Sequence, residues 1–193
     1  MKKMLSLAGL AFVAIGIATF PALSARAGDS AHLYAGATKC KTCHGKEEIG
    51  DQYKVWSESK HAHAMESLKT DKAREWGAKK GIADPSTAKE CVECHTTAYT
   101  APAELKGSKY SIDEGVSCEA CHGAGNDYKK KSTMIDVKLA EAAGLVPQTE
   151  QVCTQCHNDK SPAWTSFDYA AAKAKIAHPV PEGYDPNADE EEE

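Results

Sequence analysis

The sequence predicts one mostly α-helical domain with little regular sheet, and three observations support this prediction. Cysteine and histidine recur together four times along the chain, always in the same short motif. Several segments between these motifs place apolar residues at helical spacing and end at glycine or proline. Aromatic residues make up only 7% of the 193 residues and the mean hydropathy is −0.50, so the side chains alone supply a thin core.

Residues 1–27 have the pattern of a secretory signal peptide. Lys2 and Lys3 precede an apolar run over residues 5–20, and Ala25-Arg26-Ala27 supplies the small residues of a cleavage site. This run is shorter than the ~20 residues that span a bilayer, and no cysteine follows it to carry a lipid anchor. We expect cleavage after Ala27 and a soluble chain in the periplasm or outside the cell, without stable membrane insertion.

The charge of the expected mature chain restricts its partners. Without the three basic residues of the signal it has 20 Lys and Arg against 28 Asp and Glu, a formal net charge of −8. Such an acidic protein is unsuited to nucleic acid or anionic membrane surfaces, and it favours partners with a basic docking surface.

The eight cysteines of the chain all belong to C-x-x-C-H motifs, the signature of covalent haem attachment. Two cysteines on one helical turn can form thioethers with the two vinyl groups of a porphyrin, and the next histidine then binds the iron. Disulfides, structural zinc and thiol redox chemistry are the alternatives for a lone C-x-x-C pair. Four complete copies favour four covalent haems c, attached at Cys40, Cys43, Cys91, Cys94, Cys118, Cys121, Cys153 and Cys156, with proximal histidines His44, His95, His122 and His157.

The haems also explain the thin core, because the porphyrins themselves would form the hydrophobic interior. The pattern divides the chain into the signal peptide, a haem domain over residues 28–180 and an acidic, disordered tail over residues 181–193. Within the haem domain we expect an irregular lead at 28–39, a loop with at most short strands at 96–117, and helices at 52–80, 135–143 and 166–177. Ser166 is the expected cap of the last helix.

Four histidines remain as candidates for the second axial ligands, namely His32, His61, His63 and His178. On a regular helix His61 and His63 point about 200° apart, so they could serve two haems on opposite sides of that helix. His178 closes the last expected helix before Pro179, whereas His32 lies in a terminal segment of the kind that is usually mobile. Ligation by Met65 or Met134 is the less favoured alternative.

Several of these segments together resemble the cytochrome c-554 family of multihaem cytochromes. The resemblance covers nearly all of the expected mature chain, and its residues occur in the family's order and spacing. It rests on Ala35-Gly36, Trp56-Ser57-Glu58-Ser59-Lys60-His61-Ala62, Met65-Glu66-Ser67-Leu68, Gly115-Val116-Ser117-Cys118-Glu119-Ala120-Cys121-His122-Gly123, Cys153-Thr154-Gln155-Cys156-His157-Asn158, and Phe167-Asp168 through His178.

The resemblance implies a helical fold around four closely stacked haems and electron transfer in the periplasm. Nitrifier members of the family accept electrons from hydroxylamine oxidoreductase, and most of their irons are bis-histidine while one is five-coordinate. His61 and His178 match family distal ligands. The stretch 126–133 lacks the histidine that the family would have after the third motif, whereas His32 and His63 are additional, so the family's ligand set does not transfer whole.

Three hypotheses for function follow. The leading one is a carrier of electrons between redox protein partners, without enzymatic activity, because bis-histidine irons have no open position for chemistry. The second is a reductase of a small nitrogen species at one five-coordinate haem. The third is a subunit of an extracellular filament, as similar tetrahaem cytochromes of metal-reducing bacteria form, with self-assembly through His32.

Overall fold

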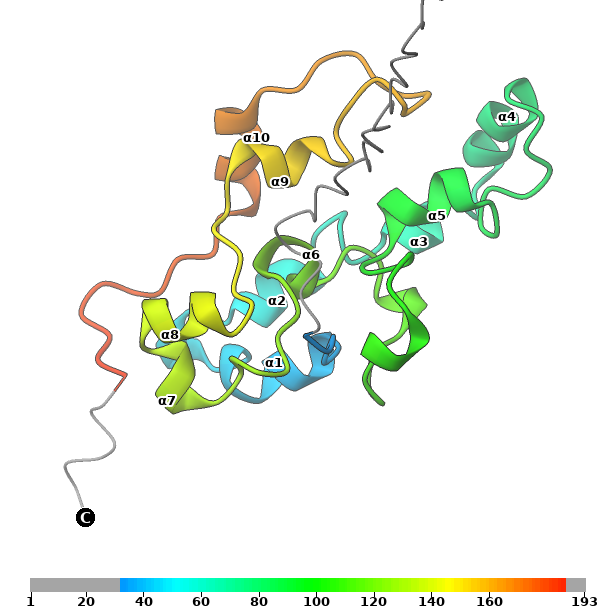
Figure 1. The fold of residues 1–193 in the computed structure, drawn as a ribbon. Coiled ribbons are helices and arrows are strands. Elements are labelled where there is room, and N and C mark those ends of the chain that lie inside the picture. Colours follow the sequence, from blue (N-terminus) through cyan, green and yellow to red (C-terminus); the bar gives the residue numbers. More distant parts are fainter. Residues whose placement is uncertain (1–31, 187–193) are drawn as a thin grey trace, which may run out of the picture.

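The computed structural model describes residues 32–186, and this part of the chain is mostly helical, as predicted (Figure 1). Its only β-structure among the described residues is an isolated parallel bridge between Tyr34 and Lys106. The predicted signal peptide and residues 187–193 of the predicted tail lie outside the described range. The α-helices are α1 Ala37–His44, α2 Gln52–Ser57, α3 Ala64–Ser67, α4 Asp71–Lys79, α5 Lys89–His95, α6 Cys118–His122, α7 Lys131–Met134, α8 Val137–Ala142, α9 Glu150–Thr154 and α10 Tyr169–Ile176, and the 3₁₀ helices are η1 Glu47–Ile49, η2 Ala103–Leu105 and η3 Ile112–Glu114.

Helix α1 packs against α2 and α6, while α3 packs against α5 and η3. The first and third haem motifs therefore lie in one group of contacting helices, and the second motif lies in another. Figure 1 shows these groups in different parts of the ribbon, with α9 and α10 forming a further part. Segments far apart in sequence thus meet through short helices rather than through a sheet.

The expected continuous helix over residues 52–80 is wrong. The chain forms α2, a turn that holds His61 and His63, then α3 and α4. The carbonyl of His61 accepts a local hydrogen bond from the amide of Ala64, and it also has a tertiary partner, the amide of Val116. Thr70 then starts α4 by accepting a hydrogen bond from the amide of Ala73 at 3.2 Å. His61 and His63 therefore do not lie on opposite faces of one helix.

The two later helices are shorter than expected because aspartates define their starts. Asp136 accepts hydrogen bonds from the amides of Lys138 and Leu139, so α8 begins at Val137. Asp168 accepts from the amide of Ala171, so this residue, rather than Ser166, caps α10. Between the second and third motifs, η2 and η3 interrupt the expected loop.

The core among the described residues is thin, as the composition predicts. Met65 and Leu68 pack against Val92, with Cys91 and Tyr99 at the margin. Half of the buried apolar residues are alanines, which bury little surface: Ala35, Ala37, Ala64, Ala124 and Ala140. Within residues 32–186, no helix has both the length and the apolar character needed to cross a membrane.

Candidate haem-binding site

The C-x-x-C-H motifs lie on short helices or at helix ends. Helices α1 and α5 end at the histidines of their motifs, His44 and His95, and α6 consists of the whole third motif. The fourth motif straddles the end of α9 and continues into a turn that holds His157. Each pair of cysteines is thus separated by one helical turn, the arrangement that two thioethers to one porphyrin require.

None of the eight cysteines forms a disulfide, and cysteine side chains from different motifs meet. A side-chain hydrogen bond between Cys40 and Cys118 raises the pKa of Cys40 and lowers the pKa of Cys118. Burial, together with the neighbouring Cys94, raises the pKa of Cys156 to about 12. The attachment points of the first and third motifs therefore adjoin each other, as do those of the second and fourth.

Two of the motif histidines face two of the candidate distal histidines. The ring centres of His61 and His157 are 6.0 Å apart, and those of His122 and His178 are also 6.0 Å apart. An iron bound on opposite sides by two imidazole nitrogens, each about 2 Å away, requires ring centres roughly 6 Å apart. Both pairs fit a bis-histidine iron, and the ring of Phe167 stacks on His157 at 4.8 Å between ring centres.

Burial keeps these imidazoles in the neutral form that binds metal. Desolvation lowers the pKa of His122 to about 4, with smaller contributions from His178 and His44. Desolvation also lowers the pKa of His157, and it lowers the pKa of His61 together with the neighbouring His157.

Carbonyl acceptors orient several of the rings. The Nδ1 atom of His178 lies 2.7 Å from the carbonyl oxygen of Ile176, and that of His95 lies 2.8 Å from the carbonyl oxygen of Ala64. In His44, Nδ1 lies 3.3 Å from Oε1 of the buried Gln52. Each acceptor places the ring proton on Nδ1, which leaves Nε2 for an iron.

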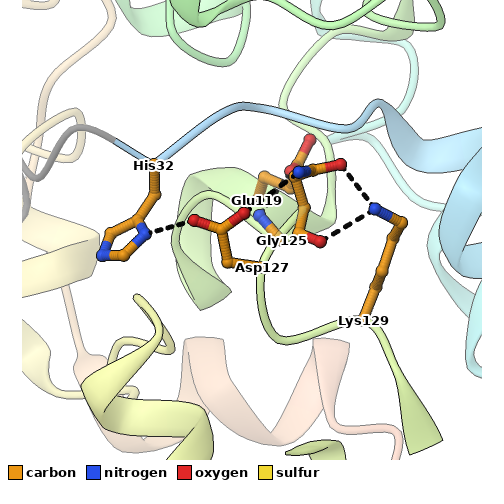
Figure 2. Close-up of polar contacts among 6 residues, drawn as sticks. His32, Glu119, Gly125, Asp127 and Lys129 are labelled. Carbon is orange, nitrogen blue, oxygen red and sulfur yellow. Dashed lines mark hydrogen bonds and ion pairs between the residues drawn. The ribbon is translucent and has the colours of Figure 1, made fainter.

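His32 is held by a side chain, contrary to the expectation of a mobile arm. Its Nδ1 lies 2.7 Å from Oδ2 of Asp127, a contact that Figure 2 shows. Its ring packs against Gly144. The loop that carries Asp127 is itself anchored, since the amide of Asn126 donates to the carbonyl of Leu33. A carboxylate on Nδ1 is the usual support of a metal-binding imidazole, and it leaves Nε2 free to bind.

His63 has a different environment from the other candidates. Its side chain is 55% exposed, and its Nδ1 lies 3.2 Å from the exposed Glu66 carboxylate one turn along the chain. The next residue, Ala64, contacts Nδ1 of His95, which is the side of that ring away from Nε2.

Three residues that sequence reasoning missed contribute to this site: Gln52, Asp127 and Glu119. Gln52 and Asp127 support His44 and His32, and Glu119 is a buried carboxylate within the third motif. Only Glu119 has a sequence signal, because it stands between the two cysteines of a motif. The partners of Asp127 and Glu119 are distant in sequence, so no local pattern reveals them.

A mostly helical chain with a thin core, repeated C-x-x-C-H turns and facing imidazoles has the features of a multihaem c-type cytochrome. The family model described as "Cytochrome c554 and c-prime" matches residues 39–123, which contain the first three motifs. Cytochrome c-554 of Nitrosomonas europaea is 28% identical over 145 residues, 64% of this chain. Both matches support the resemblance to the cytochrome c-554 family that the sequence predicted.

The alignment leaves part of both proteins unmatched. It spans 57% of the length of the Nitrosomonas europaea protein, so the activity and partners of that protein do not transfer as a whole. No solved structure matches the chain.

Proposed function

We propose that this protein is an exported tetrahaem cytochrome that carries electrons between redox proteins and has no substrate of its own. The observation that carries the proposal is the 6.0 Å spacing of the His61–His157 and His122–His178 rings. An iron held between two such imidazoles has no open position, so it exchanges electrons without binding a substrate.

Each haem would be held by the two cysteines and the histidine of one motif, and bound haem supplies reversible one-electron reduction at its iron. The chain's own residues would attach, orient and shield the four groups. His157 and His61 would hold the iron of the fourth motif, and His122 and His178 that of the third. Gln52 would keep the proton of His44 on Nδ1 and so direct Nε2 to the iron of the first motif.

Contacts between the motifs support a continuous electron path. The thiols of Cys40 and Cys118 adjoin, and Cys156 adjoins Cys94 and lies near Cys121. Haems attached at these sulfurs would have neighbouring edges, in the order first to third, third to fourth, and fourth to second. Electrons could enter at one end of this series and leave at the other.

His32 is the proposed second ligand for the iron of the first motif. Asp127 fixes its ring with Nε2 free, and the ring packs on Gly144, whose carbonyl lies against Gly123 beside His122. His44 also lies close enough to His122 to contribute to the lowered pKa of His122, so both imidazoles lie around the third motif. His63, exposed and paired with Glu66, is the candidate with the least structural support.

A second function is favoured by one observation, the environment of His95. Among the described residues, the polar contacts of its ring are the carbonyl of Ala64 and the hydroxyl of Ser67, both at Nδ1, and neither group is an imidazole. An iron bound to Nε2 of His95 would keep its sixth position for a small molecule. Reduction of a small nitrogen species there would be an activity additional to electron transfer.

The proposed partners are proteins with basic docking surfaces, because the expected mature chain has a formal charge of −8. The pattern of residues 1–27 supports export, and the family resemblance supports the periplasm. The donor and the acceptor are taken to be redox proteins.

Electron paramagnetic resonance of the ferric protein, quantified per haem, tests both functions. Two or more low-spin irons would support the electron carrier, and four high-spin irons would overturn the bis-histidine pairs. A single high-spin iron that binds cyanide or nitric oxide would support the open site at His95. Failure of the protein to bind either molecule would remove the reductase.

A further inference from the structure

Glu119 is a buried carboxylate at the junction of two haem motifs. It lies between Cys118 and Cys121 in the third motif, and only 3% of its surface is exposed. A buried carboxylate requires hydrogen-bond partners to offset the loss of water, so its contacts indicate what it does.

All three partners of this carboxylate are backbone amides. Oε1 accepts from the amides of Ala35 at 2.7 Å and Gly125 at 2.6 Å, and Oε2 accepts from the amide of Gly36 at 2.9 Å. Figure 2 shows Glu119 beside Gly125, in the loop that also carries Asp127. In every contact the oxygens act as acceptors, which is the role of an ionised carboxylate.

These contacts tie the start of the first haem helix to the third motif. Ala35 and Gly36 immediately precede α1, and the next amide, that of Ala37, donates to Glu114 at 3.0 Å. Backbone from another segment packs closely against Gly36, whose φ is +88° and where a Cβ would lie 2.3 Å from the carbonyl oxygen of Lys109. The orientation of α1 relative to α6 therefore depends on Glu119.

We propose that Glu119 is a positioning residue that aligns the first and third haem motifs, and that its buried charge lowers the reduction potential of the haems attached to them. This inference rests on the proposed haem attachment. Reduction adds one electron to a ferric iron and removes one positive charge, so a nearby anion stabilises the ferric form. Burial strengthens this effect, since water screens the charge poorly.

Glu93 provides a matched control, because it also lies between the cysteines of a haem motif but is exposed. Glu119→Gln and Glu93→Gln each remove one negative charge without changing side-chain length. We expect E119Q to raise the ratio of ferrous to ferric haem about threefold or more for at least one haem in a spectroelectrochemical titration at fixed potential. E93Q should leave the ratio for every haem nearly unchanged, since water screens its charge.

Equal titrations of E119Q and the parent would overturn the inference, as would equal shifts in E119Q and E93Q. Haem content and the spin state of the parent are measured first, so that a failure of the proposed haem attachment is recognised separately. If E119Q does not accumulate with its haems, the same titration is carried out on Glu119→Asp. This variant keeps the negative charge, but its shorter side chain reaches the three amides less well. Parent-like potentials with a lower unfolding midpoint in E119D would support the proposal, and raised potentials would contradict it.

Discussion

The imidazole rings of His61 and His157 lie 6.0 Å apart at an interplanar angle of 69°, although the two residues belong to distant parts of the chain. His122 and His178 repeat the same spacing with an angle of 60°. The main structural support for haem ligation is therefore the presence of two separate histidine pairs at the spacing that an iron requires.

Replacing either of the proposed distal histidines should leave one iron without its second axial ligand. His61→Ala and His178→Ala are each expected to convert one low-spin haem to high-spin, because the second strong-field imidazole is lost. Quantified electron paramagnetic resonance of the ferric variants measures this change. His63→Ala is the control, since its exposed ring contacts Glu66, and it should resemble the parent. An unchanged spectrum for H61A would contradict the proposed pairing.

The Asp127 carboxylate should support iron binding by His32. We expect His32→Ala to add one high-spin haem and added imidazole to restore the low-spin signal. Asp127→Asn should weaken the affinity of His32 for the iron about 10–100-fold, because the asparagine amide supports the imidazole less strongly. A parent-like spectrum for H32A would rule out His32 as a ligand.

The chain should not fold without its haems. Substituting alanine for all eight cysteines removes every attachment point and leaves a core built around Met65, Leu68 and Val92. Far-UV circular dichroism is expected to show loss of most helical signal, as in small domains that need their metal to fold. Helix content equal to that of the haem-bound protein would disprove the dependence.

Gly36→Ala should destabilise the haem-bound protein more than Gly81→Ala. Both glycines have positive φ, +88° and +74°, a backbone conformation that costs alanine about 1–3 kcal/mol. Only at Gly36 would the new Cβ meet backbone, whereas at Gly81 nothing lies within 4 Å. We expect roughly 2 kcal/mol more loss in G36A, seen as a lower guanidinium midpoint. Equal midpoints would show that the contact with Lys109 relaxes freely.

Much of this protein could be predicted from sequence because its signals are local. Each C-x-x-C-H motif sits within one helical turn, so its spacing indicates attachment chemistry without knowledge of the fold. Sparse aromatics likewise predicted the thin core that the described residues have. The resemblance to the cytochrome c-554 family, which the matches support, was also recognisable from short segments around these motifs.

The sequence by itself determined the helical class, the four C-x-x-C-H motifs and the set of candidate histidines. Only the tertiary structure decided that His61 faces His157, that His178 faces His122, and that residues 52–80 break into three helices. The physical reason is that these outcomes depend on contacts between distant segments, such as the bond from the Val116 amide to the His61 carbonyl. Helical propensity acts over a few residues, and such long-range contacts override it.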